Sequence, residues 1–149
     1  MQIKYILKFI HLPFHAKWML LEAVVCSACY RFQILYRPFS SLAPKIGRFW
    51  YETACEEIED HRIMEVRWAV AAVCLRTPWE SRCLVRALTA KKMLNRRGLP
   101  CTLYMGVKEE QKAGMAAHAW LRCGNIFVTG GNGAGAYAVT AIFGDEQHP

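Results

Sequence analysis

The feature that most constrains the fold is a change of periodicity at residues 96–100, which read RRGLP. Before this segment, apolar residues recur with helical spacing. After it, short apolar runs are separated by polar and glycine-rich turns. Gly98 can adopt the left-handed conformation that ends many helices, and Pro100 prevents a helix from continuing. Helices followed by strands predict an α+β fold with a small antiparallel sheet.

One helix is expected directly before this change, beginning near Cys83 and ending near Leu94. Its leucines repeat with helical spacing, and Ser81 is placed to cap its N-terminus. An earlier helical stretch is expected over residues 48–74. It carries an acidic cluster at residues 56–60, which is interpreted as a solvated helix face and not as an acid/base pair.

The second half of the chain has four strand-like segments. Strands are expected at residues 101–107, 117–123, 126–129 and 137–143, with Gly124-Asn125 as a tight turn and residues 108–114 as a loop. A glycine-rich run occupies residues 130–135. It lacks the Lys-Ser/Thr pair and the following helix of a phosphate-binding loop, so it is interpreted as a flexible rim beside an active site. No nucleotide or other cofactor is expected.

The chain has 149 residues, 54% of them hydrophobic, which suits one domain with its own core and excludes a disordered chain. Residues 1–75 are expected to form a helical N-terminal part that packs on a core formed by residues 76–149. The apolar stretch 18–36 has the length of a membrane span, but Glu22 and Arg31 interrupt it. It is interpreted as a buried helix that contacts the core or a partner protein, with a peripheral membrane contact as the alternative.

The net charge of +7 suits an acidic peptide, a nucleic acid or an anionic membrane. Neither a zinc-finger spacing nor an aromatic-basic RNA motif is present, so nucleic acid is not expected as a partner. The odd number of cysteines, seven, and the lack of a clear secretory signal favour free thiols in a reducing cytoplasm. Cys26 and Cys29 form a C-x-x-C pair, but no second pair completes a zinc site. They are interpreted as apolar helix residues, and no metal is expected.

Two residues of the second half are typical of a nucleophilic enzyme. Cys83 stands in the first turn of its predicted helix, where free N–H groups and the helix dipole stabilise a thiolate and can bind an oxyanion. His118 lies in a predicted strand with alanines on both sides. A thiolate paired with a histidine that accepts and returns a proton is the usual arrangement for acyl transfer. The spacing alone leaves open a core cysteine and a hydrogen-bonded strand histidine.

Three motifs resemble the lasso-peptide leader peptidase, the B-protein family of lasso-peptide biosynthesis. They are SRCLVRAL at 81–88, RRGLP at 96–100 and AHAWL at 117–121. The resemblance covers residues 79–131 and implies a transglutaminase-like, papain-like core with Cys83 as nucleophile and His118 as its base. It also implies removal of the leader from a ribosomally made precursor, before a separate ATP-dependent cyclase closes the macrolactam. The chain resembles the stand-alone peptidase half of a split pair, to which a small leader-recognition protein delivers the leader.

The resemblance leaves the third catalytic position open. The family usually has an aspartate about where Gly130 stands, yet no acidic residue occurs between Glu110 and Asp145. Asn132 is the candidate, because two residues further along a strand it would share the same face, and an asparagine can orient a catalytic histidine. Thr129 and backbone carbonyls are alternatives. The missing acid also supports a second hypothesis, a non-catalytic transglutaminase-like scaffold in a peptide-maturation complex.

Overall fold

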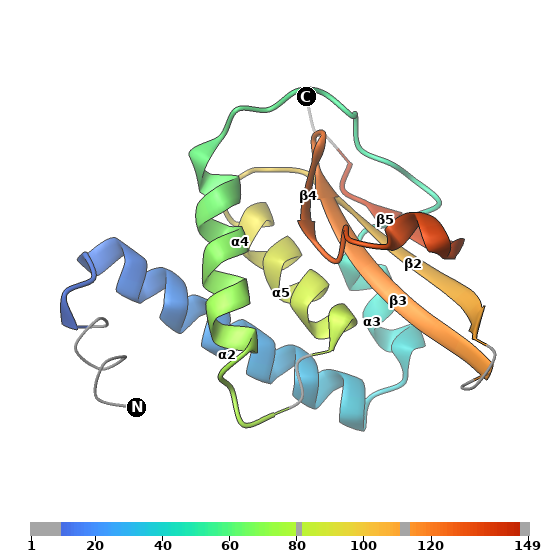
Figure 1. Ribbon diagram of the computed structural model, residues 1–149, viewed down its shortest axis with the longest axis horizontal. Coiled ribbons are helices and arrows are strands. Elements are labelled where there is room, and N and C mark those ends of the chain that lie inside the picture. The colour runs from blue at the N-terminus through green and yellow to red at the C-terminus, as the bar shows by residue number, and fades with distance from the viewer. Residues whose placement is uncertain (1–9, 80–81, 111–113, 147–149) are drawn as a thin grey trace.

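The computed structural model describes residues 10–79, 82–110 and 114–146, and in it helices pack against one face of a sheet (Figure 1). The helices are α2 (Phe14–Tyr36), α3 (Phe39–Ile46), α4 (His61–Cys74) and α5 (Cys83–Asn95). The strands are β1 (Arg48–Phe49), β2 (Cys101–Glu110), β3 (Gly114–Cys123), β4 (Ile126–Thr129) and β5 (Ala138–Gly144), with a short 3₁₀ helix η1 (Ala134–Ala136) before β5. The α+β prediction is therefore confirmed.

The described strands form one antiparallel sheet in the order β1-β5-β2-β3-β4. β2 and β3 pair over their full length, from Cys101 opposite Cys123 to Glu110 opposite Gly114, so both extend into the segment expected as a loop. Gly124-Asn125 forms the turn into β4, with Gly124 in the left-handed region at φ 54°. The four expected strands are confirmed. β1 is an addition that pairs with β5.

The helix predicted over residues 48–74 is wrong in its first half, because α4 begins only at His61. The preceding segment is held against the sheet by buried hydrogen bonds. The backbone N–H of Thr53 donates to Thr102 Oγ1 at 2.9 Å, and the two hydroxyl oxygens lie 2.7 Å apart. The Arg122 guanidinium donates to the Thr53 carbonyl at 3.0 Å. These tertiary hydrogen bonds hold the segment in a non-helical conformation, although the spacing of its apolar residues predicts a helix.

The acidic cluster divides into one structural residue and three solvated ones. Asp60 occupies the N-cap position of α4, where its Oδ1 accepts a hydrogen bond from the Arg62 N–H at 2.9 Å. Glu56, Glu57 and Glu59 are exposed, as expected, although the segment that carries them is not helical. The cluster is therefore a helix cap beside solvent-facing charges.

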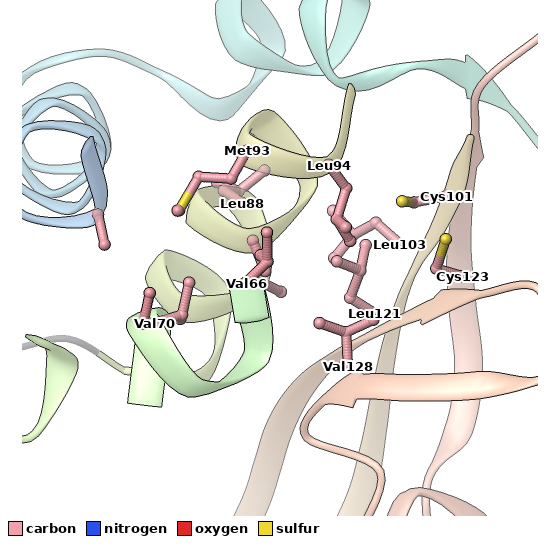
Figure 2. Close-up of a cluster of buried hydrophobic side chains, with 14 of the residues drawn as sticks. Val66, Val70, Leu88, Met93, Leu94, Cys101, Leu103, Leu121, Cys123 and Val128 are labelled. Atoms are coloured by element: carbon pink, nitrogen blue, oxygen red, sulfur yellow. The ribbon is translucent and has the colours of Figure 1, made fainter. Parts of the chain in front are cut away.

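A single large core lies between the helices and the sheet, with α5 at its centre (Figure 2). It joins Val66 and Val70 of α4, Leu88, Met93 and Leu94 of α5, Leu103 of β2, Leu121 of β3 and Val128 of β4. Met19 and Ala23 of α2 belong to the same cluster. The N-terminal helices and the strand-bearing half of the chain thus share one core.

The C-terminal end of α5 follows the signals in the sequence. The Leu94 carbonyl accepts hydrogen bonds from the N–H groups of Arg97 at 2.8 Å and Leu99 at 3.1 Å. Gly98 lies between these donors in the left-handed region, at φ 71°. The glycine therefore ends the helix and turns the chain toward β2, as predicted.

The apolar helix α2 is buried on one face only. Within the part of the chain that the structure describes, α2 is the one helix long and apolar enough to cross a membrane, by length and composition alone. Only 22% of that apolar window is buried inside the protein. The interpretation as a buried helix thus holds for the side that carries Met19 and Ala23 and not for the opposite side.

Candidate active site

Cys83 is the first residue of α5 and is half-buried. Its helix lies against β2, β3 and β4, and the side chain packs on the main core. The first N–H groups of a helix have no partner inside it, and Arg82 at the N-cap position supplies no side-chain cap. Ser81, the predicted cap, lies outside the described residues. The start of α5 therefore presents N–H donors and the positive end of the helix dipole to the region of the Cys83 sulfur.

The other six cysteines lack this setting. Four are buried (Cys26, Cys74, Cys101 and Cys123) and two are exposed (Cys29 and Cys55), and none of the six begins a helix. Cys101 and Cys123 face each other across β2 and β3 (Figure 2). The neighbouring Cys123 thiol and burial raise the pKa of the Cys101 thiol, which makes it a poor nucleophile.

His118 lies on β3, is half-buried and has a fixed ring. Its Nε2 lies 2.8 Å from the carbonyl oxygen of Gly130, just past the end of β4. A carbonyl only accepts hydrogen bonds, so Nε2 carries the hydrogen and Nδ1 of the neutral ring keeps its lone pair. The imidazole also contacts the rings of Trp120 and Tyr137, with centroid distances of 5.8 and 5.0 Å. The ring is thus oriented, and Nδ1 is the nitrogen able to accept a proton.

Among the described residues, no hydrogen bond joins Asn132 to this ring, and an orienting role of Asn132 stays a prediction. β4 ends at Thr129, and Asn132 lies exposed in the turn beyond it, so the strand alternation that suggested it does not extend that far. The hydrogen-bond partner that the structure gives the ring is the backbone carbonyl of Gly130, and backbone carbonyls were one of the alternatives. At its φ of 68°, an added Cβ would lie 2.6 Å from the Ala119 carbonyl oxygen and 3.1 Å from His118 Nε2. Only glycine suits this position.

The alternation of side chains along β3 places His118 on the face opposite the core that Cys83 contacts. Side chains alternate along a strand, and Ala119 and Leu121 belong to the core cluster on which Cys83 packs. His118 shares the opposite face with Trp120. Among the described residues, no hydrogen bond joins the Cys83 sulfur to the imidazole of His118. The helix that carries Cys83 packs on the strand that carries His118. Direct contact of the two side chains stays a prediction.

The cluster of aromatic side chains around His118 was not predicted from the sequence. Tyr104 and Trp120 stack with ring centroids 5.6 Å apart and planes 6° apart, and the buried Ala134 of η1 packs on them. Gly106 lies opposite His118 on β2, where an added Cβ would lie 3.0 Å from the Trp120 ring. The H-x-W spacing was the available signal, because residues two apart on a strand share a face.

The glycine-rich run forms the edge of a shallow groove. The groove has a volume of about 430 Å³ and is lined by Arg67 and residues 126–132. Beyond it the chain turns through Gly133, in the left-handed region at φ 80°, into η1. In the described ranges, no three His, Cys, Asp or Glu side chains are grouped so that they could hold a metal ion. The candidate reactive groups of the site are the Cys83 sulfur and the His118 imidazole.

Comparison with known proteins assigns these residues to a family. No curated protein and no solved structure matches the chain. The family model described as the Transglutaminase-like superfamily matches residues 26–142, well over half of the chain, and this range contains both Cys83 and His118. The chain therefore belongs to the transglutaminase-like superfamily, which includes cysteine proteases and transglutaminases.

Proposed function

We propose that the chain is a cysteine peptidase of the cytoplasm that removes the leader from a ribosomally made lasso-peptide precursor. The observation that carries the proposal is the position of Cys83 as first residue of α5, the helix that packs on the strand of His118. The CLVRA and HAW motifs support the choice of substrate, because they resemble those of leader peptidases. In this proposal the partners are the precursor peptide, a small leader-recognition protein and an ATP-dependent cyclase.

The mechanism is acyl transfer through a thioester. Nδ1 of His118 accepts the thiol proton of Cys83, and the thiolate attacks the scissile carbonyl carbon. The N–H groups of the first turn of α5 stabilise the oxyanion, and His118 then returns the proton to the leaving amine. Water, deprotonated by the same imidazole, hydrolyses the thioester and releases the thiol. The sulfur and Nδ1 have to come within hydrogen-bond reach, which catalytic pairs often achieve only with substrate bound.

The direct test compares Cys83→Ala with Cys55→Ala. Cys55 is a matched control because it is an exposed free cysteine in a segment without regular structure. Cleavage of a precursor peptide, followed by mass spectrometry, should fall by at least about a thousandfold in Cys83→Ala and stay at the native rate in Cys55→Ala. Circular dichroism should show both variants folded. Undiminished cleavage by Cys83→Ala would refute the assignment of the nucleophile.

A second candidate function is a non-catalytic scaffold in a peptide-maturation complex. The alternation of β3 favours it, because His118 shares a face with Trp120 and not with the core that Cys83 contacts. Alkylation by iodoacetamide, mapped by mass spectrometry, distinguishes the two functions. In a peptidase, Cys83 should react at least roughly tenfold faster near neutral pH than the exposed Cys29 and Cys55, since the thiolate is the reactive form. Equal rates at the three thiols would favour the scaffold.

A further inference from the structure

The outer face of α2 carries a row of exposed apolar side chains. On its inner face, Met19 and Ala23 are no more than 2% exposed. Seven large apolar residues on the outer side are each half exposed or more: Phe14, Trp18, Leu21, Val25, Phe32, Leu35 and Tyr36. These seven residues are named the α2 stripe. The core therefore uses only part of the apolar surface of this helix.

The α2 stripe follows one side of the helix along almost its whole length. Its positions are three, four or seven residues apart, apart from the adjacent last pair, which keeps them on one side of a helix. With 23 residues, α2 is roughly 35 Å long, and the stripe spans nearly all of it. Near its start, Met64 and Trp68 of α4 are also exposed and line an apolar hollow of about 400 Å³ with Pro13 and Ala16. Further exposed apolar side chains therefore lie near the N-terminal end of the stripe, beside the ion pair of His15 and Glu65.

Basic groups border this surface. Arg96 and Arg97 follow α5 and line a hollow of about 370 Å³ together with three residues of the α2 stripe. Glu22 is the only acidic residue of α2, and its carboxylate accepts hydrogen bonds from Arg96 at 3.0 Å and Arg97 at 2.8 Å. The acidic charge on α2 is thus neutralised within the protein, while the chain as a whole carries +7.

We propose that the α2 stripe docks on the surface of an anionic membrane, with α2 lying in the plane of the interface. Four of its seven residues are aromatic, and helices of this kind bury aromatic and aliphatic side chains at the boundary of headgroups and acyl chains. The two arginines outnumber the one carboxylate that they bind, and the Arg96 side chain, which is 54% exposed, is placed to meet negatively charged headgroups. α2 lies on the membrane and does not span it, because its inner face is part of the protein core.

A second copy of the chain is the competing occupant of this surface. Two paired α2 helices would need knobs-into-holes packing, which favours aliphatic residues at the contact positions over the large aromatic rings found here. Such a pair would also bring the bordering arginines of both copies toward each other, and like charges oppose association. Lipid headgroups carry the complementary charge. The observations therefore favour the membrane.

Flotation of the purified full chain with lipid vesicles tests the proposal. Vesicles of phosphatidylcholine alone are compared with vesicles that also contain phosphatidylglycerol, at low and at high salt. The native chain should float with the anionic vesicles and release at high salt. The double variant Trp18→Gln/Phe32→Gln should lower the bound fraction by at least roughly tenfold. Leu75→Gln/Met115→Gln, which alters two equally exposed apolar residues elsewhere, should bind like the native chain.

Three results would overturn the proposal. They are a native chain that does not float with anionic vesicles, a stripe variant that floats as well as the native chain, and a control variant that loses binding equally. Sedimentation supplies the competing outcome: a native dimer that the stripe variant dissociates, without any vesicle binding, would assign the surface to a second copy. The proposal does not rest on peptidase activity, so the cleavage and flotation assays fail independently.

Discussion

Replacing Gly130 by alanine tests whether a backbone carbonyl orients His118. Gly130 lies in the left-handed region at φ 68°, and an added Cβ would lie 2.6 Å from the Ala119 carbonyl oxygen and 3.0 Å from Trp120 Cβ. Both neighbours are fixed by the β3 backbone, so the turn after β4 has to move away. The 2.8 Å hydrogen bond between His118 Nε2 and the Gly130 carbonyl should break with that movement.

The expected loss of stability in Gly130→Ala has two parts. Holding alanine in the left-handed region costs about 1 to 2 kcal/mol. The forced contact and the lost hydrogen bond add about 1 to 3 kcal/mol. Gly133→Ala is the matched control, because Gly133 has a φ of 80° but an added Cβ there would meet no atom within 4 Å. The Gly133→Ala control should lose only the free energy that holding alanine in the left-handed region costs.

Urea unfolding followed by tryptophan fluorescence measures both variants under the same conditions. The free energy of unfolding should be lower in Gly130→Ala than in Gly133→Ala by about 1 to 3 kcal/mol. The NMR signals of the His118 ring nitrogens should shift in Gly130→Ala and stay in place in Gly133→Ala. Equal losses in the two variants, with unchanged ring signals, would show that the carbonyl of Gly130 does not hold the imidazole.

Two further predictions concern charged groups. Lys91→Met should cost about 3 to 5 kcal/mol in urea unfolding, because Lys91 is 3% exposed and pairs with Asp145 at 2.6 Å; Lys92→Met, at the exposed neighbouring lysine, should cost little. Burial alone would raise the pKa of Glu22, but hydrogen bonds from two arginines outweigh it and lower the pKa from its ordinary value of 4.5. The carboxylate therefore stabilises the fold above that value and loses this effect as pH falls through the folded-state pKa, so the unfolding free energy of Glu22→Gln should fall less steeply on acidification. If the unfolding free energy of Glu22→Gln fell as steeply on acidification as that of the native chain, this linkage would be contradicted.

Elements with strong local signals were predictable from the sequence. α5 follows Pro78 and is ended by Gly98, and the hairpin between β3 and β4 has a glycine at its turn. The sequence predicts a helix over residues 50–60, but their conformation depends on the hydrogen bonds of Thr53 to the sheet, which no local sequence pattern indicates. The two faces of α2 could not be told apart either. Apolar residues surround that helix, and only the packing decides which of them are buried.

The group that orients the His118 ring was harder to predict than the strands. Because no acidic residue occurs near Gly130, the sequence favours a polar side chain nearby, such as Asn132, as the orienting residue. A carbonyl leaves no mark in the sequence, because every residue has one, and its use depends on the left-handed turn after β4. An aspartate at this position would meet the same Ala119 oxygen as alanine does, so Gly130→Asp should destabilise the chain and not restore a triad. The carbonyl orients the imidazole without adding a charge. The reactivity of the Cys83 thiol then decides whether that histidine acts as a base.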